Sequence, residues 1–454
     1  MTWPQAATIA EAVRTGKMTA TQAVDDALAR IAASNPALNA FTDVLADRAR
    51  ARARTNPSGP LAGVPFAVKN LFDIAGMPTR AGSRINRADP VAPADAVLVQ
   101  RMETAGAILV GALNMGEYAY DFTGENIHDG ASRNPHDLAR MTGGSSGGSG
   151  GAVAGGLVPI ALGSDTNGSI RVPASLCGLF GLKPTYGRLS RAGTFPFVSS
   201  FDHLGPLARS TLDLALAYDA MQGPADGDPG CAGRAADPVA SGIGANVGGL
   251  RIALAGGYFQ HGASPEALAA LHAVAAGLGA TRVIELPGAA RARAAAYVIT
   301  ASEGAALHLE RLRTRAADFD PATRDRLIAG ALTPASLVVQ AQKFRRVFQA
   351  AMRAAFEDVD VILAPATPCT APLLGQQDFE IAGQMVPVRA NLGLYTQPIS
   401  FIGLPVVAVP VFAGALPIGV QVIAAPWRED IALRVAHTLE QAGICTAMPP
   451  KGAF

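Results

Sequence analysis

The segment from Gly143 to Arg171 constrains this chain more than any other, because two glycine-rich loops there flank an apolar stretch. Nine glycines lie within residues 143–163, and each glycine costs roughly 1 kcal/mol in the interior of a helix or strand. Glycine suits places where the backbone adopts unusual dihedral angles or approaches a ligand closely. Ser145 lies in the first loop, and Ser169 ends the tight sequence DTNGS in the second. Hydroxyls beside loops that present backbone N–H groups are typical of an acyl-transfer site.

A serine hydroxyl is a weak nucleophile and needs a neighbouring base. Lysine can be that base only when neutral, whereas its ordinary pKa of about 10.4 keeps nearly all of it charged at pH 7. Burial can lower this pKa by ~3–5 pH units, and Lys69 ends the apolar residues 64–68, which we predict to form a short buried strand. Ser145 would then carry the proton between Lys69 and Ser169.

Each of these residues also has a structural alternative. Ser145 could belong to a flexible glycine-serine linker or cap a helix, and Lys69 could be a solvated surface charge. Asp165 and Arg171 are expected to form an ion pair that holds the loop. A phosphate-binding loop is disfavoured, because the sequence has neither a GxxxxGK[ST] motif nor a GxGxxG motif between a strand and a helix.

The chain resembles the amidase signature hydrolases over several separated blocks. The main block runs from Gly143 through SDTNGSIRVPASLCGLFGLKPTYGR to Arg188. Further blocks are GPLAGVPFAVKNLFD around Lys69, LNMGEYAY from Leu113, and LPVVAVP and LPIGVQVIA near the C-terminus. The resemblance covers nearly the whole chain and implies an α/β fold with a mixed central β-sheet sandwiched by helices.

The resemblance also implies catalytic roles. Ser169 corresponds to the nucleophile, Ser145 to the bridging serine and Lys69 to the base, and the peptide bond before Ser145 is expected to be cis. One oxyanion-hole donor is typically worth about 10²–10³ in rate. The expected donors are the backbone N–H groups of Thr166, Asn167, Gly168 and Ser169. No cofactor and no metal are expected.

Two branches of the family bear on the substrate. In the glutamyl-tRNA amidotransferase branch, whose A-type subunit hydrolyses glutamine and channels ammonia, an arginine in a QKxR motif holds the substrate carboxylate, and Arg345 matches it. That branch also has an acidic residue shortly before a TxP motif, where this chain has Gly393. The segments DTNGSIRVPASLCG and GENIHDGASRNPHD look more like the 1-carboxybiuret hydrolase branch of cyanuric acid degradation, whose substrate is a small, planar, urea-like anion.

We therefore expect a hydrolase of C–N bonds in linear amides (EC 3.5.1) that releases ammonia through a Ser-Ser-Lys acyl-enzyme mechanism. Arg345 is expected to bind the substrate carboxylate through a bidentate fork, and the Asn167 amide to bind the urea-type group. His308, Arg311 and Arg313 are weaker candidates for the pocket. Arg345 could instead be a helix-surface arginine, and Asn167 could merely tolerate a left-handed turn.

Two other functions stay open: an amidotransferase A-type subunit that supplies ammonia to a partner, and a non-catalytic binding module that retains the fold. The branch resemblance implies a small helical partner like the C-type subunit of the amidotransferase, and we expect an oligomer.

The formal net charge of +1 argues against a nucleic-acid partner. Four cysteines without CxxC spacing indicate a reducing cytoplasm rather than a zinc site or disulfide framework.

No contact with a membrane is expected. The N-terminal thirty residues carry acidic side chains and helical periodicity, where a secretory signal would need a continuous apolar run. Residues 141–164 carry no charge, but their glycine and serine content argues against a membrane helix.

The chain of 454 residues is 49% hydrophobic, enough to bury a large core. We predict a helical segment with two helices over residues 1–60 and a catalytic domain over residues 61–454, with an inserted α/β lobe at about residues 205–330. The other predicted elements are a buried helix at 148–157, a surface loop at 223–249, strands at 249–255, 281–286 and 359–363, helices at 265–278 and 337–356, and two final strands followed by a helix at 428–441.

Overall fold

The computed structural model describes residues 3–452. Its strands are β1 (Phe41–Val44), β2 (Pro65–Lys69), β3 (Ile108–Leu113), β4 (Arg133–Asn134), β5 (Asp137–Met141), β6 (Ile160–Asp165), β7 (Phe180–Lys183), β8 (His203–Ala208), β9 (Ile252–Ala255), β10 (Arg282–Ile284), β11 (Val361–Pro365), β12 (Asp378–Ile381), β13 (Gln384–Pro387), β14 (Val406–Val411) and β15 (Ile418–Ala424). Its α-helices are α1 (Ala6–Arg14), α2 (Ala20–Leu38), α3 (Ala46–Ala53), α4 (Val97–Thr104), α5 (Gly147–Ala154), α6 (Arg171–Cys177), α7 (Thr211–Met221), α8 (Pro265–Gly277), α9 (Ala289–Arg315), α10 (Pro321–Ala331), α11 (Ala335–Asp358), α12 (Val388–Asn391), α13 (Gln397–Ser400) and α14 (Glu429–Gln441).

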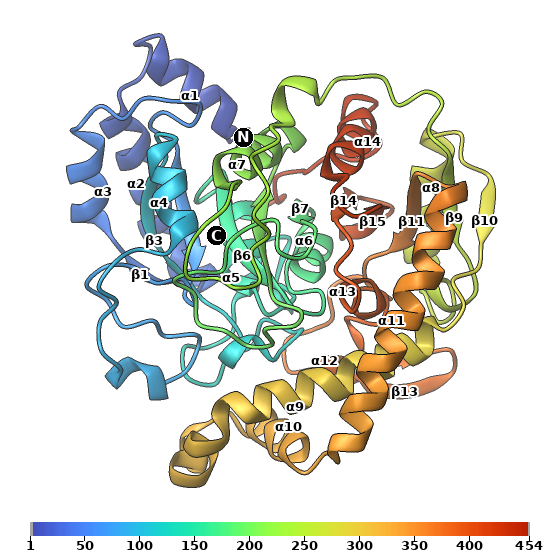
Figure 1. The fold of residues 1–454 in the computed structure, drawn as a ribbon. Coiled ribbons are helices and arrows are strands. Elements are labelled where there is room, and N and C mark those ends of the chain that lie inside the picture. The colour runs from blue at the N-terminus through green and yellow to red at the C-terminus, as the bar shows by residue number, and fades with distance from the viewer. Residues whose placement is uncertain (1–2, 453–454) are drawn as a thin grey trace.

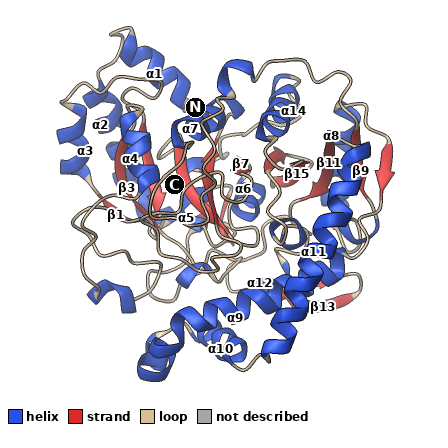
Figure 2. Cartoon of the chain, in the orientation of Figure 1, coloured by secondary structure: helices blue, strands red, loops and turns tan. Residues whose placement is uncertain are grey.

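One 11-stranded mixed sheet organises the molecule, in the order β1-β3-β2-β6-β8-β7-β14-β15-β11-β9-β10. β2 is parallel to β3 and β6, and β9 is parallel to β10 and β11, whereas the neighbours from β6 to β11 in this order are antiparallel. The strands cross the middle of the molecule and the helices lie around them (Figure 2). The predicted α/β fold is therefore confirmed.

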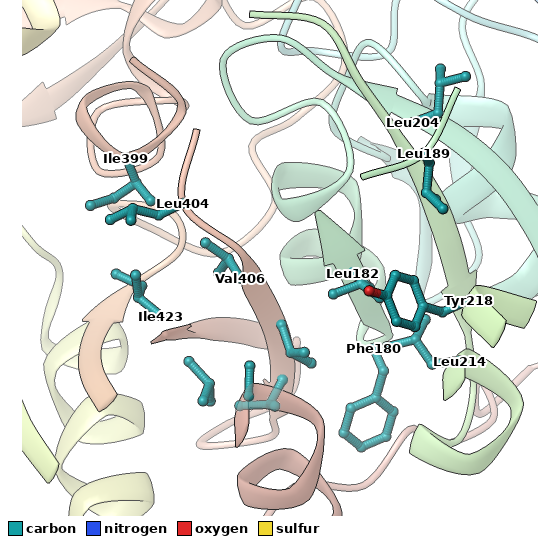
Figure 3. Close-up of a cluster of buried hydrophobic side chains, with 14 of the residues drawn as sticks. Phe180, Leu182, Leu189, Leu204, Leu214, Tyr218, Ile399, Leu404, Val406 and Ile423 are labelled. Atoms are coloured by element: carbon teal, nitrogen blue, oxygen red, sulfur yellow. The ribbon is translucent and has the colours of Figure 1, made fainter. Parts of the chain in front are cut away.

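The central strands are apolar on both faces. Every residue of β3, β6, β14 and β15 is buried. A strand covered on both faces needs apolar residues at consecutive positions rather than alternate ones, as the sequence VVAVPV of β14 has. Figure 3 shows part of the resulting core, where Phe180 and Leu182 of β7 lie near Tyr218 of α7, and Val406 of β14 belongs to the same cluster.

The first sixty residues differ from the prediction of two helices. They form α1, α2 and α3, and between the last two lies β1, which pairs with β3 at the edge of the sheet. β1 has only four residues, of which one is buried. A strand of this length is too short to show an alternation of apolar and polar residues in the sequence. The N-terminal segment therefore contributes to the central sheet, at the end coloured blue in Figure 1.

The elements predicted after residue 205 are largely confirmed, since β9, α8, β10, α11, β11 and α14 lie where the sequence placed a strand or helix. The strands β9 and β10 do not form a separate sheet, because β9 pairs with β11 and extends the central sheet. The boundaries of the inserted lobe stay a prediction.

The long helix α9 lies below the sheet in Figure 1, with the shorter α10 beside it, and the long helix α11 packs against α9. None of the helices within residues 3–452 has the length and apolar character needed to cross a membrane.

Candidate active site

Lys69 is the last residue of β2 and is fully buried. Its Nζ donates hydrogen bonds to Ser145 Oγ at 2.7 Å and to Ser164 Oγ at 2.8 Å. Burial lowers the pKa of Lys69 to about 7, although nearby carboxylates, that of Asp202 foremost, oppose this shift. A large fraction of Lys69 is thus neutral near pH 7, which is the state that a general base requires.

Ser145 lies between the end of β5 and α5, and its hydroxyl is buried. The peptide bond between Gly144 and Ser145 is cis, as the resemblance implies. All residues of α5 are buried, which confirms the predicted buried helix of small residues. A Cβ atom at Gly148 would lie 2.5 Å from the backbone nitrogen of Asn114, so only glycine lets this helix approach the end of β3 so closely.

Ser169 lies in the loop between β6 and α6. Gly168 adopts a φ of +143°, and a Cβ atom there would come within 2.2 Å of Thr396 Oγ1. The same Thr396 hydroxyl donates to the carbonyl oxygen of Asn167 at 2.7 Å, which fixes the loop. The backbone N–H groups of residues 166–169 form no hydrogen bond within the described part of the chain. They are therefore available to a ligand's oxygen atom, as an oxyanion hole requires.

A buried ion pair between Arg171 and Asp165 stabilises the loop that carries Ser169. Arg171 Nε and Nη2 donate to the two carboxylate oxygens of Asp165, both at 2.9 Å, and both side chains are fully buried. Although burial alone would raise the pKa of Asp165, the Arg171 guanidinium holds it below its ordinary value. Arg171 Nη1 also donates to Gln421 Oε1 at 2.7 Å. These contacts fit the expected role of the pair as scaffolding.

Replacing Asp165 with asparagine is expected to lower the free energy of unfolding by about 3–5 kcal/mol, because it leaves the Arg171 guanidinium buried without its charge partner. Urea unfolding monitored by circular dichroism measures this loss. Asp360→Asn, which breaks an exposed ion pair with Arg251, is the matched control and is expected to cost much less than Asp165→Asn, because water screens the exposed charges. Similar losses in both variants would contradict the scaffolding role.

A small cavity of about 30 Å³ lies in front of Ser169. Most of the residues that line it come from the Ser169 loop, from the segment before β4 and from α9, α10 and α12; they include Asp121, Thr166, Asn167, Ser169, Thr300, Arg326 and Arg389. These polar side chains lie around the Ser169 hydroxyl, as the binding of a small polar ligand requires.

Asn167 lines this cavity and has an unused acceptor atom. Its Nδ2 donates to Thr300 Oγ1 at 2.9 Å, so the orientation of the amide is fixed. Its Oδ1 is buried and has no hydrogen-bond partner among the described residues. A buried polar atom without a partner is costly, and a ligand N–H group would satisfy it.

Arg345 does not line the cavity, in contrast to the predicted carboxylate site. Its Nε donates to the carbonyl oxygen of Phe401 at 2.6 Å, its Nη2 donates to that of Ser200 at 2.9 Å, and its guanidinium lies 4.7 Å from the centroid of the Phe201 ring. These contacts use Nε and Nη2, and they are directed at backbone carbonyl oxygens. Because Arg345 lies outside the cavity lining, its contacts indicate a structural role, in which α11 is tied to the loop before β8.

His308 also lies outside the cavity lining. Its ring packs 4.0 Å from the Tyr118 ring, measured between centroids, and burial lowers the pKa of His308 to about 3. It is therefore neutral at pH 7 and supplies no charge. Arg311 forms an ion pair with Asp89 at 2.8 Å, and Arg313 is exposed. None of these three weaker candidates is a pocket charge in this structure.

The sequence alone does not reveal four residues of this site. Arg326 of α10, Arg389 of α12 and Thr300 of α9 line the cavity, and Ser164 of β6 bonds Lys69. Ser164 begins the block SDTNGSIR, which gives it no evident role, whereas the other three belong to no recognisable motif, and an isolated arginine in a helix is usually solvated. Only the packing of α9, α10 and α12 beside the Ser169 loop brings them together.

Comparison with known proteins places this geometry in a family. The family model named Amidase matches residues 22–433. The chain is 54% identical over 447 residues to AtzE of Pseudomonas sp. (strain ADP), which forms part of 1-carboxybiuret hydrolase, covering 96% of this chain and 98% of that protein. It is 38% identical over 463 residues to the A-type subunit of glutamyl-tRNA(Gln) amidotransferase from Azotobacter vinelandii (strain DJ), covering 94% of each.

Solved structures agree with this assignment. One, described as a vestigial protein complex that reveals the evolutionary origins of an s-triazine catabolic enzyme, superposes with a TM-score of 0.97 at 53% identity and covers 98% of this chain and 100% of that chain. The 6-aminohexanoate cyclic dimer hydrolase complexed with substrate superposes with a TM-score of 0.88 at 31% identity and covers 99% of both chains. The chain therefore belongs to the amidase signature family and is a hydrolase of carbon–nitrogen bonds in amides.

Proposed function

We propose that this hydrolase cleaves a C–N bond of a small, carboxylated, urea-like amide of the 1-carboxybiuret type and releases ammonia. The observation that carries the catalytic part is the buried hydrogen bond of 2.7 Å between Lys69 Nζ and Ser145 Oγ, next to a cavity lined by Ser169. The 54% identity to a 1-carboxybiuret hydrolase component supports the substrate class.

In the proposed reaction, neutral Lys69 takes the proton of Ser145 as Ser145 takes that of Ser169. The Ser169 Oγ then attacks the amide carbonyl carbon, and the backbone N–H groups of residues 166–169 stabilise the negative oxygen. The proton returns from Lys69 through Ser145 to the leaving nitrogen, so ammonia departs and an acyl-enzyme forms. Water, deprotonated by the same relay, attacks the acyl carbon and releases the acid product and Ser169.

The amidotransferase alternative has less support. A Cβ atom at Gly393 would lie 2.3 Å from Cζ of the Phe122 ring, so this ring occupies the space that an acidic side chain would need. The binding-module alternative leaves unexplained why a fully buried lysine with a pKa lowered to about 7 contacts two serine hydroxyls. Both observations favour a small-molecule amidohydrolase.

The proposal includes an oligomeric assembly with a small helical partner like the C-type subunit of the amidotransferase. Support comes from a relative that is itself named as one component of a hydrolase, together with a similar structure described as a protein complex. A cytoplasmic location is also part of the proposal, because the four cysteines Cys177, Cys231, Cys369 and Cys445 are unpaired, as is usual in a reducing compartment.

Ammonia release by the purified protein tests the proposed function. We expect release from a carboxylated biuret, with slower release from glutamine and from a simple aliphatic amide, because the cavity offers guanidinium groups and the Asn167 acceptor to the first substrate. A Ser169→Ala preparation controls for contaminating amidases. A faster reaction with glutamine than with the carboxylated biuret would contradict the proposal and favour the amidotransferase function.

A further inference from the structure

We propose that Arg326, with Arg389 beside it, forms the carboxylate-binding end of the Ser169 cavity, and that Asn167 Oδ1 accepts an N–H group at the other end. The ligand class is then a small ureido carboxylate. This inference rests on the proposed function, since it names the groups that select the substrate.

Arg326 is a cation without an acidic partner. Its Nε donates to the carbonyl oxygen of Ala322 at 3.0 Å, its Nη2 donates to that of Tyr120, and its guanidinium carbon lies 3.8 Å from the centroid of the Tyr120 ring. No carboxylate within residues 3–452 forms an ion pair with it, whereas Arg389 is paired. Because a guanidinium stays charged even where burial lowers its pKa, its charge is left for a ligand to neutralise.

Asp121 cannot serve as that partner, because its oxygens are already occupied. They accept hydrogen bonds from Thr123 N at 2.9 Å, Thr123 Oγ1 at 2.8 Å, Gly124 N at 2.6 Å and Arg389 Nη1 at 2.8 Å. The cavity lining thus contains two guanidinium groups against one saturated carboxylate. The resulting positive charge favours an anion.

The groups that line the cavity also differ in what they offer a ligand. Asn167 lies two residues before Ser169, and its buried Oδ1 can only accept a hydrogen bond. Arg326 and Arg389 belong to α10 and α12 and can only donate. A ligand with an N–H group at one end and a carboxylate at the other satisfies both, and it places its amide beside the nucleophile.

Binding to a Ser169→Ala host tests this assignment without turnover. Isothermal titration calorimetry gives the Kd of N-carbamoylglycine, a ureido carboxylate, and of N-carbamoylglycinamide, its neutral amide. We expect the host to prefer the carboxylate, and Arg326→Met to weaken carboxylate binding by about 30-fold or more while changing amide binding little. Arg345→Met, the matched control, is expected to keep the preference.

Two further variants separate the ends of the site. Asn167→Ala is expected to weaken the binding of both ligands equally, because it removes the N–H acceptor and leaves both guanidinium groups in place. Arg326→Lys, which keeps the charge if Arg326→Met fails to fold, is expected to retain part of the preference. Thermal unfolding of each variant checks its fold.

The proposal is overturned if the host does not prefer the carboxylate, if Arg326→Met keeps that preference, or if Arg345→Met loses it to the same extent. Failure of the proposed function is a separate result, because it is seen as the absence of ammonia release by the wild-type protein while ligand binding is measured independently.

Discussion

Replacing Ser169 with alanine is expected to lower kcat by about 10⁶-fold, as for other serine nucleophiles, while the fold stays intact. The substitution removes only the attacking oxygen. The loop itself is held by the Asp165–Arg171 ion pair and by the hydrogen bond from Thr396 to Asn167, and none of these contacts involves the Ser169 hydroxyl. Ammonia release with a carboxylated biuret measures activity, and circular dichroism checks the fold.

Ser164→Ala is the matched control for this experiment. The Ser164 hydroxyl also bonds Lys69, at 2.8 Å, but it lies outside the proposed path from Lys69 through Ser145 to Ser169. We expect a much smaller loss than in Ser169→Ala. Activity that survives in Ser169→Ala, or a loss of equal size in Ser164→Ala, would contradict the assignment of the nucleophile.

Replacing Lys69 with alanine is expected to lower kcat/KM by about 10²–10⁴-fold, the usual contribution of a general base. In the wild type, the base is inactive when protonated and active when neutral. Since burial lowers the pKa of Lys69 to about 7, kcat/KM is expected to rise with pH below 7 and to level off above about pH 8.

Measurement of kcat/KM between pH 5.5 and 9, with chemistry shown to be rate-limiting, tests the expected pH dependence. Asp202→Asn supplies a second readout, because the Asp202 carboxylate raises the pKa of Lys69. Its removal is expected to move the rising limb to lower pH. A flat profile in the wild type, or a limb that stays in place in Asp202→Asn, would contradict the titration of Lys69.

The catalytic centre was the part of the site most accessible from the sequence, because its residues lie in local motifs with unusual composition. The apolar run before Lys69 predicts β2 and the burial of the lysine, and both are confirmed. The glycine-rich loops predict close backbone approach, which Gly148 and Gly168 display. The chemical roles of Lys69, Ser145 and Ser169 stay predictions.

The specificity end of the cavity could not be predicted, because it depends on tertiary packing. The sequence predicts that Arg345 lies on a helix, and α11 confirms this. The contacts of its guanidinium with Ser200 and Phe401 depend on which segments α11 packs against, and the sequence does not show that packing. Arg326 reaches the cavity because α10 packs against α9. For a similar reason, the central strand β8 is hidden in the sequence, since Gly205 and Pro206 interrupt its pattern although it pairs with β6 and β7.

Labelling with a fluorophosphonate, followed by peptide mapping, tests the central claim most directly, because the reagent reacts only with an activated serine hydroxyl. The account predicts one adduct, on Ser169, with a labelling rate that rises through about pH 7 and falls sharply in Lys69→Ala. An adduct on a different serine, or labelling of Ser169 at an unchanged rate in Lys69→Ala, would contradict it.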